Sequence, residues 1–332
     1  MAEVAVLGAS GYAGALTAQV LWRHPWFALV AVTSRSDAGR RLDDLHPRYR
    51  VPLVLEELDL DRLAGRLDAV VVAFPHGAAA PVVRHLRALN VRVVDLSADF
   101  RLRDRDVYER HYGEHGAPEL LADAVYGLTE LYRETVREAD LVAGPGCYPT
   151  AALLALAPLA RAGLIADVVI DAKSGVSGAG REPNHATHFV SADENMNPYK
   201  VAGHRHTPEI DQELAELGAP VAATFTPHLV PLDQGELVSC YVTPSTEVEA
   251  GEVHALYRDA YESEEFVEVR ESPPGVREVR DTNICRISVH ADPRTGKVLV
   301  FAAIDNLWKG TASQAVQNLN LMFDRPEGEG IS

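Results

Sequence analysis

Cys147 is the residue of this sequence whose position most clearly suggests chemistry. It stands in GPGCYPT, between a glycine turn and the expected first turn of an alanine- and leucine-rich helix, where Pro149 is tolerated. The unpaired amides and the positive end of a helix dipole favour a thiolate over a thiol at such a place. Cys147 is therefore predicted to be a nucleophile, whereas Cys240 and Cys285 lie in strand patterns and are expected to be buried and inert.

The segment GHRHTPEI supplies acid/base groups for a thiolate reaction. His204 and His206 precede a predicted helix with Thr207 as N-cap, Pro208 as first helical residue and Glu209 in the first turn. Either imidazole could transfer a proton, and Glu209 could orient it by hydrogen bonding.

The same histidines leave metal binding as an alternative, because His185 and His188 lie nearby in the sequence. Neither pair has further ligands in a recognised structural-zinc arrangement, and a thiolate reaction with a nicotinamide needs no metal. No metal site is therefore expected.

The N-terminal stretch EVAVLGASGYAGALTAQVLWRH has the pattern of a nucleotide-binding turn. An apolar strand from Val4 to Leu7 leads through glycines spaced G-x-x-G-x-x-G into a helix from about Ala13 to Arg23. Although G-x-G-x-x-G is the commoner spacing, free amides at a helix N-terminus can face a pyrophosphate in either case. The predicted cofactor-binding residues here are Gly8, Ser10, Gly11, Tyr12 and Gly14.

The next predicted strand, FALVAVTSRS, indicates which nicotinamide cofactor is used. NAD-binding folds usually place an acid against the ribose 2′-hydroxyl about 20 residues after the glycines. Here the chain has Ser34, Arg35 and Ser36, whose hydroxyls and guanidinium suit a 2′-phosphate. NADP is therefore expected, and Asp37 is the residue that opposes this interpretation.

Further apolar runs alternate with helix-like stretches and predict an α/β fold with a doubly wound parallel sheet. DAVVVAFPHG and VRVVDLSADF end in polar or glycine residues, which places His76 and Arg101 at the carboxyl ends of strands, where such sheets bind ligands. After Pro149 longer strands with turn breaks predict a mixed or antiparallel sheet, so the second domain is expected to be α+β.

The glycine-rich segment KSGVSGAGR, residues 173–181, is expected to bind an anion or a cofactor phosphate through hydroxyls, amides and Arg181. Ser177 and Gly178 are its predicted cofactor-binding residues. The final helix follows Asn306 and is expected to pack back on the first domain. Asn306, a further predicted cofactor-binding residue, and Lys309 are expected near the cleft. The tail RPEGEGIS is expected to be frayed.

Composition excludes several functional classes. The 332 residues are 47% hydrophobic and 24% charged, as in a soluble globular protein, and no signal peptide or long apolar run is recognisable. The net charge of −17 opposes binding to nucleic acid or an anionic membrane. Three scattered cysteines fit a reducing compartment, so a cytoplasmic protein is expected.

Nearly the whole chain resembles the N-acetyl-gamma-glutamyl-phosphate reductase family, NADPH-dependent acyl-phosphate reductases of arginine biosynthesis related to aspartate-semialdehyde dehydrogenase. GPGCYPT is the most specific match. The matching motifs, in order, are GASGYAGA, FPHG, DLSADFRL, YGLTEL, AGPGCYPT, SGVSGAGR, GHRHTPEI, PHLVP and DNLWKGTASQAVQ.

The resemblance implies that Cys147 is acylated by N-acetyl-glutamyl 5-phosphate and that NADPH reduces the thioester to the 5-semialdehyde after phosphate is released. It implies that one histidine of HRH is the acid/base, with His206 preferred over His204. It further implies a Rossmann domain at 1–147 plus 309–332, a catalytic and oligomerisation domain at 148–308, and a homodimer or homotetramer. The predicted substrate-binding residues are Arg101, Arg181 and Arg205.

One position departs from the family pattern. After PHLVP the family usually carries an arginine before a glycine, whereas this chain has Gln234, which donates hydrogen bonds but carries no charge. If that arginine holds an anionic substrate group, Arg101, Arg181 or Arg205 must supply more of the charge here, so substrate affinity is expected to differ.

Two other functions stay open. The first is the paralogous reductase of lysine biosynthesis, which acts on a carrier-bound aminoadipyl phosphate and generally lacks the Tyr-Pro that follows Cys147 here. The second is a non-enzymatic NADP-binding sensor, in which replacing Cys147 would leave both binding and output intact.

Overall fold

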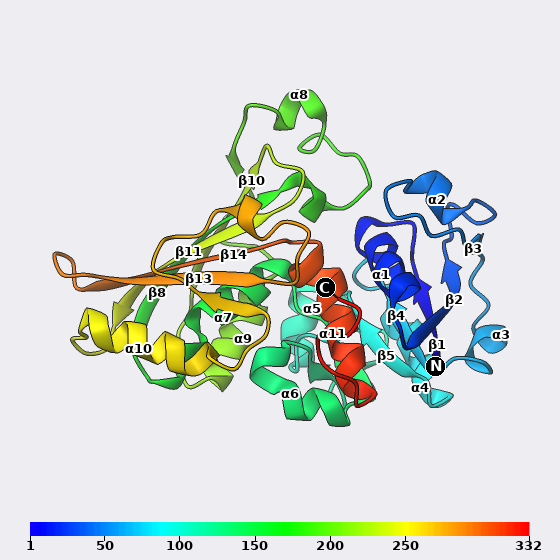
Figure 1. Cartoon of the computed structure of the whole chain (residues 1–332), viewed down its shortest axis with the longest axis horizontal. Helices are drawn as coiled ribbons and strands as arrows, with labels where there is room; N and C mark the ends of the chain where they lie inside the picture. Colours follow the sequence, from blue (N-terminus) through cyan, green and yellow to red (C-terminus); the bar gives the residue numbers. More distant parts are fainter. Residues whose placement is uncertain (332) are drawn as a thin grey trace. The chain divides into compact units, whose positions relative to one another are not determined.

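A computed structural model describes residues 1–331, and the chain divides into two compact units (Figure 1). The first unit is Met1–Gly146 together with Thr311–Ser332, and the second is Cys147–Gly310. The boundaries expected from the sequence differ from these by one or two residues.

The first unit is built on a seven-stranded sheet in the order β3-β2-β1-β4-β5-β7-β6, with every pair of neighbours parallel. Val4 to Leu7 are completely buried, as expected for a central parallel strand covered on both faces. The predicted doubly wound parallel sheet is confirmed. Its strands are β1 (Ala2–Leu7), β2 (Phe27–Thr33), β3 (Leu55–Glu56), β4 (Ala69–Val72), β5 (Arg92–Asp95), β6 (Val125–Tyr126) and β7 (Leu141–Ala143).

Helices pack in two groups in this unit. Helix α11 (Ser313–Met322) contacts α1 (Tyr12–Arg23) and α6 (Thr129–Glu138), while α3 (Leu60–Ala64) contacts α4 (Ala80–Ala88). All ten residues of α11 are buried, so the last helix packs on the first unit as predicted. The short helices α2 (Leu42–Leu45) and α5 (Arg105–Tyr112) complete the unit.

Residues 325–331 of the C-terminal tail are folded, so the expectation of a frayed tail is wrong for them, and Ser332 lies outside the described residues. Asn320 on α11 donates to the carbonyls of Glu327 and Glu329, both at 2.9 Å. The Arg325 guanidinium pairs with the Glu329 carboxylate, and His24 Nε2 bonds the Glu329 carbonyl at 2.7 Å. A composition rich in glycine and charge did not reveal these long-range partners.

The second unit is built on a mixed sheet in the order β12-β13-β14-β11-β8-β10-β9. Strands β8 and β10 are parallel, as are β12 and β13, and the other neighbours are antiparallel. The predicted α+β second domain is confirmed. The strands are β8 (Ile165–Gly175), β9 (Asn197–Pro198), β10 (Thr224–Val230), β11 (Glu236–Pro244), β12 (Val267–Val269), β13 (Cys285–Asp292) and β14 (Lys297–Ile304).

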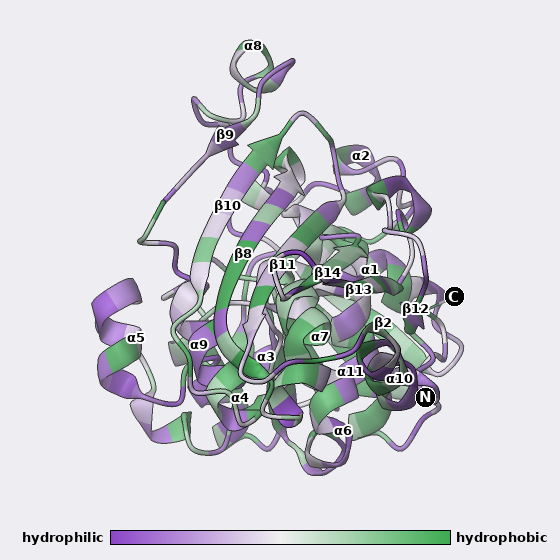
Figure 2. Cartoon of the chain, turned by 90° about the vertical axis from the view of Figure 1, so that its left-hand side faces the viewer, coloured by the Kyte–Doolittle hydropathy of each residue, from purple (hydrophilic) through white to green (hydrophobic). Residues whose placement is uncertain are grey.

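Helix α7 (Cys147–Arg161) is the core helix of this unit, because residues 148–160 are all buried. It packs on β11 and β14 and contacts α9 (Thr207–Glu216) and α10 (Ala250–Tyr261). Hydrophobic and hydrophilic residues both occur along β8 and β10, as the colours of these strands show (Figure 2). The short helix α8 (Phe189–Ala192) lies in the excursion between β8 and β9 (Figure 1).

Within residues 1–331 no helix combines the length and the apolar character that crossing a membrane requires.

Candidate active site

The second unit begins at its candidate nucleophile. Helix α7 starts at Cys147, directly after the GPG turn, and its first turn contains no acidic residue. Cys147 is partly exposed, whereas Cys240 in β11 and Cys285 in β13 are buried. The predicted position of Cys147 at a helix N-terminus is confirmed, and so is the burial of the other two cysteines.

A glycine allows the end of the second unit to lie against this cysteine. A Cβ placed on Gly310 would come within 2.8 Å of Cys147 Cβ and 3.3 Å of Cys147 Cα. The Gly310 amide donates to the Asp305 carbonyl at 2.9 Å, within a π-helical turn at Trp308–Ala312. The close approach requires glycine at position 310.

Both histidines of HRH lie in an aromatic cluster with Tyr148, the second residue of α7. The Tyr148 ring is edge-on to His204 at 5.9 Å and to His206 at 6.0 Å, between centroids. The imidazoles are 4.8 Å apart, and Tyr199 and Phe225 contact His204 at 5.4 and 5.3 Å. The cluster therefore brings the histidine motif to the N-terminus of α7.

The two histidines differ in their surroundings. His204 is 7% exposed, and burial, aided by Lys200 and Arg205, lowers the pKa of His204 to about 4. Its Nδ1 accepts a hydrogen bond from the His206 amide at 3.1 Å. A histidine with so low a pKa is neutral near pH 7 and is a poor proton carrier there, which favours the partly exposed His206.

Helix α9 begins one residue earlier than expected. His206, not Thr207, is the N-cap, and its side chain makes no capping hydrogen bond. Pro208 lies in the first turn, where its missing N–H costs nothing, and the Thr207 amide donates to the His204 carbonyl at 3.1 Å. Glu209 follows in the first turn and is buried.

Glu236 is a buried acid of this site that the sequence analysis missed. It is the first residue of β11, pairs with Ser174 of β8 and Ile304 of β14, and is completely buried. Burial raises the pKa of Glu236 to about 8, and the Cys147 side chain opposes that rise. Gly310 packs against both Cys147 and the Asp305 carbonyl, and the adjacent Ile304 pairs with Glu236, so the start of β11 lies near the thiol.

Hydrogen bonds of Asn306 fix the loop that leads into β11. Its Oδ1 accepts from the Gly235 amide at 2.7 Å, and its Nδ2 donates to Ser177 Oγ at 3.0 Å. Ser177 lies in the 3-10 turn Val176–Ala179, where a Cβ on Gly178 would lie 3.0 Å from Ser174 Oγ. Three predicted cofactor residues, Ser177, Gly178 and Asn306, thus lie together in the second unit.

Gln234 points at acidic side chains. Its Nε2 donates to Asp281 Oδ1 at 2.8 Å and to Asp305 Oδ2 at 2.7 Å, and the residue is buried. An arginine in the same place would face these two carboxylates. The departure from the family pattern therefore changes the charge balance around Asp305, and the expected effect on substrate affinity stays a prediction.

In the first unit, the chain's own packing requires two of the three predicted glycines. Gly8 has φ +84°, and a Cβ there would lie 2.5 Å from the Ala73 carbonyl oxygen. A Cβ on Gly14 would lie 2.4 Å from the Gly8 oxygen, so Gly14 lets α1 approach β1 closely. At Gly11 the nearest atom to a Cβ is the Gly8 oxygen at 3.8 Å, an ordinary contact.

The end of β2 carries the predicted 2′-phosphate residues. Ser34 Oγ donates to Ser10 Oγ at 2.9 Å, which ties the end of β2 to the glycine turn. The Asp37 carboxylate accepts from Arg40 at 3.0 Å and from Ser36 Oγ at 2.9 Å, so its charge is offset. Tyr12 packs edge-on to His46, and His46 Nε2 bonds the Ser10 carbonyl at 2.9 Å. Arg35 is exposed.

The three predicted substrate arginines lie in different units. Arg101 is in the first unit and is buried, with Nε donating to the Gly144 carbonyl at 2.8 Å and Nη2 to the Leu96 carbonyl at 3.0 Å. It therefore holds the glycine turn that precedes Cys147. Arg181 and Arg205 are in the second unit and are partly exposed.

Two further residues expected near the cleft have defined partners. His76 is exposed, and its Nδ1 accepts from the Ala98 amide at 3.0 Å. Lys309 is completely buried, and its Nζ lies 5.7 Å from the centroid of the Phe266 ring.

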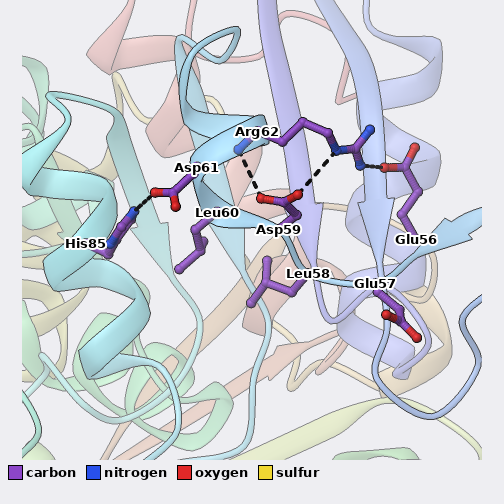
Figure 3. A pocket seen from close by; sticks show the side chains of 8 residues that line it. All are labelled: Glu56, Glu57, Leu58, Asp59, Leu60, Asp61, Arg62 and His85. Carbon is purple, nitrogen blue, oxygen red and sulfur yellow. Dashed lines mark hydrogen bonds and ion pairs between the residues drawn. The ribbon is translucent and has the colours of Figure 1, made fainter.

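A surface hollow of about 810 Å³ lies in the first unit, lined by residues 56–62 and His85 (Figure 3). Arg62 pairs there with Glu56 and Asp59, and His85 Nε2 lies 3.0 Å from Asp61 Oδ1. A hollow lined by four acidic side chains and one arginine does not suit an anionic, phosphorylated substrate.

His185 and His188 are both exposed. Among residues 1–331, no three histidine, cysteine or acidic side chains are grouped so as to hold a metal ion.

Comparison with known proteins gives the family. Residues 3–139 match the family model for the semialdehyde dehydrogenase NAD binding domain, and residues 147–306 match that for the semialdehyde dehydrogenase dimerisation domain. N-acetyl-gamma-glutamyl-phosphate reductase from Desulforudis audaxviator is 48% identical, with 100% of this chain and 98% of the relative covered. This chain belongs to the N-acetyl-gamma-glutamyl-phosphate reductase family. A second member, from Moorella thermoacetica, is 47% identical over 98% of this chain and 97% of its own length.

Solved structures show that this reductase family shares its fold with aspartate semialdehyde dehydrogenases. The Vibrio cholerae aspartate semialdehyde dehydrogenase II complexed with ASA has a TM-score of 0.75 at 18% identity, covering 98% of each chain. The Candida albicans enzyme with NADP has a TM-score of 0.72 at 15% identity, covering 97% of this chain and 98% of the other. In this reductase, the NAD binding match contains the glycine turn and the dimerisation match contains Cys147 and both histidines.

Proposed function

We propose that this protein catalyses the NADPH-dependent reduction of N-acetyl-L-glutamyl 5-phosphate to N-acetyl-L-glutamate 5-semialdehyde, with release of phosphate, in arginine biosynthesis. The observation that carries the proposal is the partly exposed Cys147 at the N-terminus of α7, beside the HRH cluster, in a member of this family. A reducing compartment, the cytoplasm, keeps such a thiol reduced.

In the mechanism, the Cys147 thiolate attacks the acyl carbon of the substrate and displaces phosphate, which leaves a thioester on the sulfur. The amides at the start of α7 stabilise the thiolate. NADPH, when bound, supplies the hydride that takes the thioester to the aldehyde level. His206, the N-cap of α9, donates and accepts the proton at the substrate oxygen. Glu209 in the first turn of α9 orients the histidine motif, and His204 stays neutral because its pKa is lowered.

The residues of the first unit suit NADP. Because packing does not require a glycine at Gly11, its missing side chain leaves room for a pyrophosphate to approach the backbone. Helix α1 has no acid in its first turn and no side-chain cap at its N-terminus, which favours an anion there. Exposed Arg35 supplies charge for a 2′-phosphate, and Arg40 with Ser36 offsets Asp37.

Anionic groups of the substrate are bound by arginines. Arg181 and Arg205 are partly exposed cations of the catalytic unit, and we assign them to the substrate carboxylates and phosphate. Arg101 contributes by holding the Gly144 carbonyl in the turn before Cys147. No nucleic-acid or membrane partner is proposed, because the net charge is −17.

The enzyme acts as a homo-oligomer through the second unit. Helices α7 and α10 pack on one face of its mixed sheet. The register places Val169, Tyr241 and Leu299 in one row of the opposite face and Phe301 in the next, all at least partly exposed. Apolar side chains exposed on a sheet face suit pairing with a second copy of the same sheet, and a dimer of such dimers would be the tetramer.

The decisive experiment omits NADPH. Wild-type protein mixed with the acyl phosphate should release up to one phosphate per site and carry an acyl adduct on Cys147, detected by mass spectrometry. Cys147→Ser should show neither, because an alcohol is a far weaker nucleophile than a thiolate. Cys240→Ala, which changes a buried cysteine of β11, is the matched control and should retain the adduct.

Each rival function predicts a different result. NADPH oxidation at full rate by Cys147→Ser with the free substrate would refute the covalent mechanism. Turnover of carrier-bound aminoadipyl phosphate alone would identify the lysine-pathway reductase. NADP binding with no turnover of either substrate, and an output unaffected by Cys147→Ser, would identify a sensor.

A further inference from the structure

Glu236 is a buried carboxyl without the partners that such a group usually has. The residue is 0% exposed, and within residues 1–331 neither of its carboxyl oxygens has a hydrogen-bond partner. Its backbone is fixed at the start of β11, between β8 and β14. A lone buried carboxylate is costly, so this carboxyl is either kept protonated or exchanges a proton with a neighbour.

The Cys147 thiol is that neighbour. Cys147 packs against Gly310, whose amide bonds the Asp305 carbonyl, and Ile304, the residue before Asp305, pairs with Glu236. The Cys147 side chain lowers the pKa of Glu236, and both residues affect the pKa values of Tyr148 and Tyr199. Asp305 is the other acid that faces Glu236, and its charge makes ionisation of Glu236 harder. Burial raises the pKa of both tyrosines, so neither phenol competes for the proton near neutral pH.

We propose that the Glu236 carboxylate is the base that removes the proton from the Cys147 thiol. Transfer of the proton within this pair leaves its total charge at −1, so no additional charge is buried. The amides at the start of α7 then stabilise the sulfur anion. The histidines of HRH then remain available for proton transfer at the substrate oxygen.

Proton affinities fit this exchange. The pKa of Glu236 is raised to about 8, close to the ordinary value of about 8.5 for a cysteine thiol. Transfer between groups of similar pKa is nearly balanced, which suits a base. The Glu236–Cys147 pair should lose its two protons in two coupled steps. Acylation requires the form of the enzyme in which the pair has already lost one proton.

The step balances without any further reactant. The S–H bond breaks as an O–H bond forms on Glu236, and the sulfur electron pair forms the S–C bond with the acyl carbon. The C–O bond to phosphate breaks, and phosphate leaves with that electron pair and takes a proton from solvent. When the aldehyde forms and the S–C bond breaks, the thiolate recovers its proton from Glu236.

Alkylation of the free enzyme tests the pair without any substrate, and so independently of the proposed function on which the acylation step rests. Iodoacetamide modification of Cys147 is followed by mass spectrometry of its peptide between pH 5 and 10. We expect the wild-type rate to rise in two steps and Glu236→Gln to show a single step. Glu213→Gln, a change at a completely buried glutamate of α9, should follow the wild type.

Acylation provides the second measurement. The phosphate burst without NADPH should slow about 10²- to 10⁴-fold in Glu236→Gln, as for loss of a general base, and Glu236→Asp should restore part of it. Superposable alkylation profiles for wild type and Glu236→Gln, or a burst within about threefold of wild type, would overturn the proposal. A missing burst in the wild type itself would refute the proposed function, while the alkylation profiles would still decide the role of Glu236.

Discussion

Replacing Gly310 by alanine places a methyl group where Cys147 already lies. The new Cβ would be 2.8 Å from Cys147 Cβ, 3.3 Å from Cys147 Cα and 3.4 Å from the Asp305 carbonyl oxygen. None of these atoms is the far end of a flexible side chain, so relief requires the backbone to move. Either the start of α7 or the turn at Trp308–Ala312 must shift by several tenths of an ångström.

The cost follows from the same geometry. Overpacking a well-filled site costs about 1–3 kcal/mol, and we expect Gly310→Ala to lower the free energy of unfolding by that amount. Displacing a nucleophile by about 1 Å can cost roughly 10²-fold in rate, so a smaller shift should reduce the acylation burst about ten- to a hundredfold.

Urea unfolding and the phosphate burst measure the two effects. Gly251→Ala is the matched control, because a Cβ on this residue of α10 would meet no atom within 4 Å. That change should leave the burst unaltered and stabilise the helix by up to about 1 kcal/mol. Our reasoning is wrong if Gly310→Ala acylates as fast as the wild type, or if the control loses as much activity.

Three further changes have expected outcomes. The pKa of Glu236 is raised from 4.5 to about 8 in the folded protein, so ionisation of Glu236 does not affect the free energy of unfolding below pH 4.5 and lowers it progressively between pH 4.5 and about 8. Glu236→Gln should therefore be more stable than wild type at pH 8 by up to about 5 kcal/mol and equal to it at pH 4, measured by urea unfolding. Arg35→Ala should weaken NADPH about ten- to a hundredfold and NADH little in binding titrations, whereas equal losses would refute the 2′-phosphate contact. Leu299→Asp, on the sheet face opposite α7 and α10, should lower the molar mass measured by sedimentation toward that of the monomer. An unchanged molar mass would exclude this face as the interface.

The nucleophile could be predicted because local signals define it. A glycine turn, a cysteine and a first-turn proline specify a helix start within seven residues, GPGCYPT, and α7 begins at that cysteine. The parallel sheet of the first unit could be predicted for the same reason, since residues 4–7, 69–72 and 141–143 are continuous apolar runs that end in turn residues.

Glu236 could not be predicted because its role depends on distant partners. In ELVSCYVTP it stands at the start of a strand, where a charged residue is usually solvated. Its burial arises from pairing with β8 and β14, more than sixty residues away on either side. Gln234 is similar, because Asp281 and Asp305 approach it only after the sheet has formed.

The location of α11 affects the order in which the chain can fold. The second unit is one continuous stretch, Cys147–Gly310, whereas the first also needs the helix that begins at Ser313. During synthesis the first 146 residues emerge long before α11. The surfaces of α1 and α6 that α11 covers therefore stay exposed until the last helix has been made. The part of the chain made first is therefore completed last, and a protein truncated after Gly310 should retain a foldable second unit beside an unfinished first one.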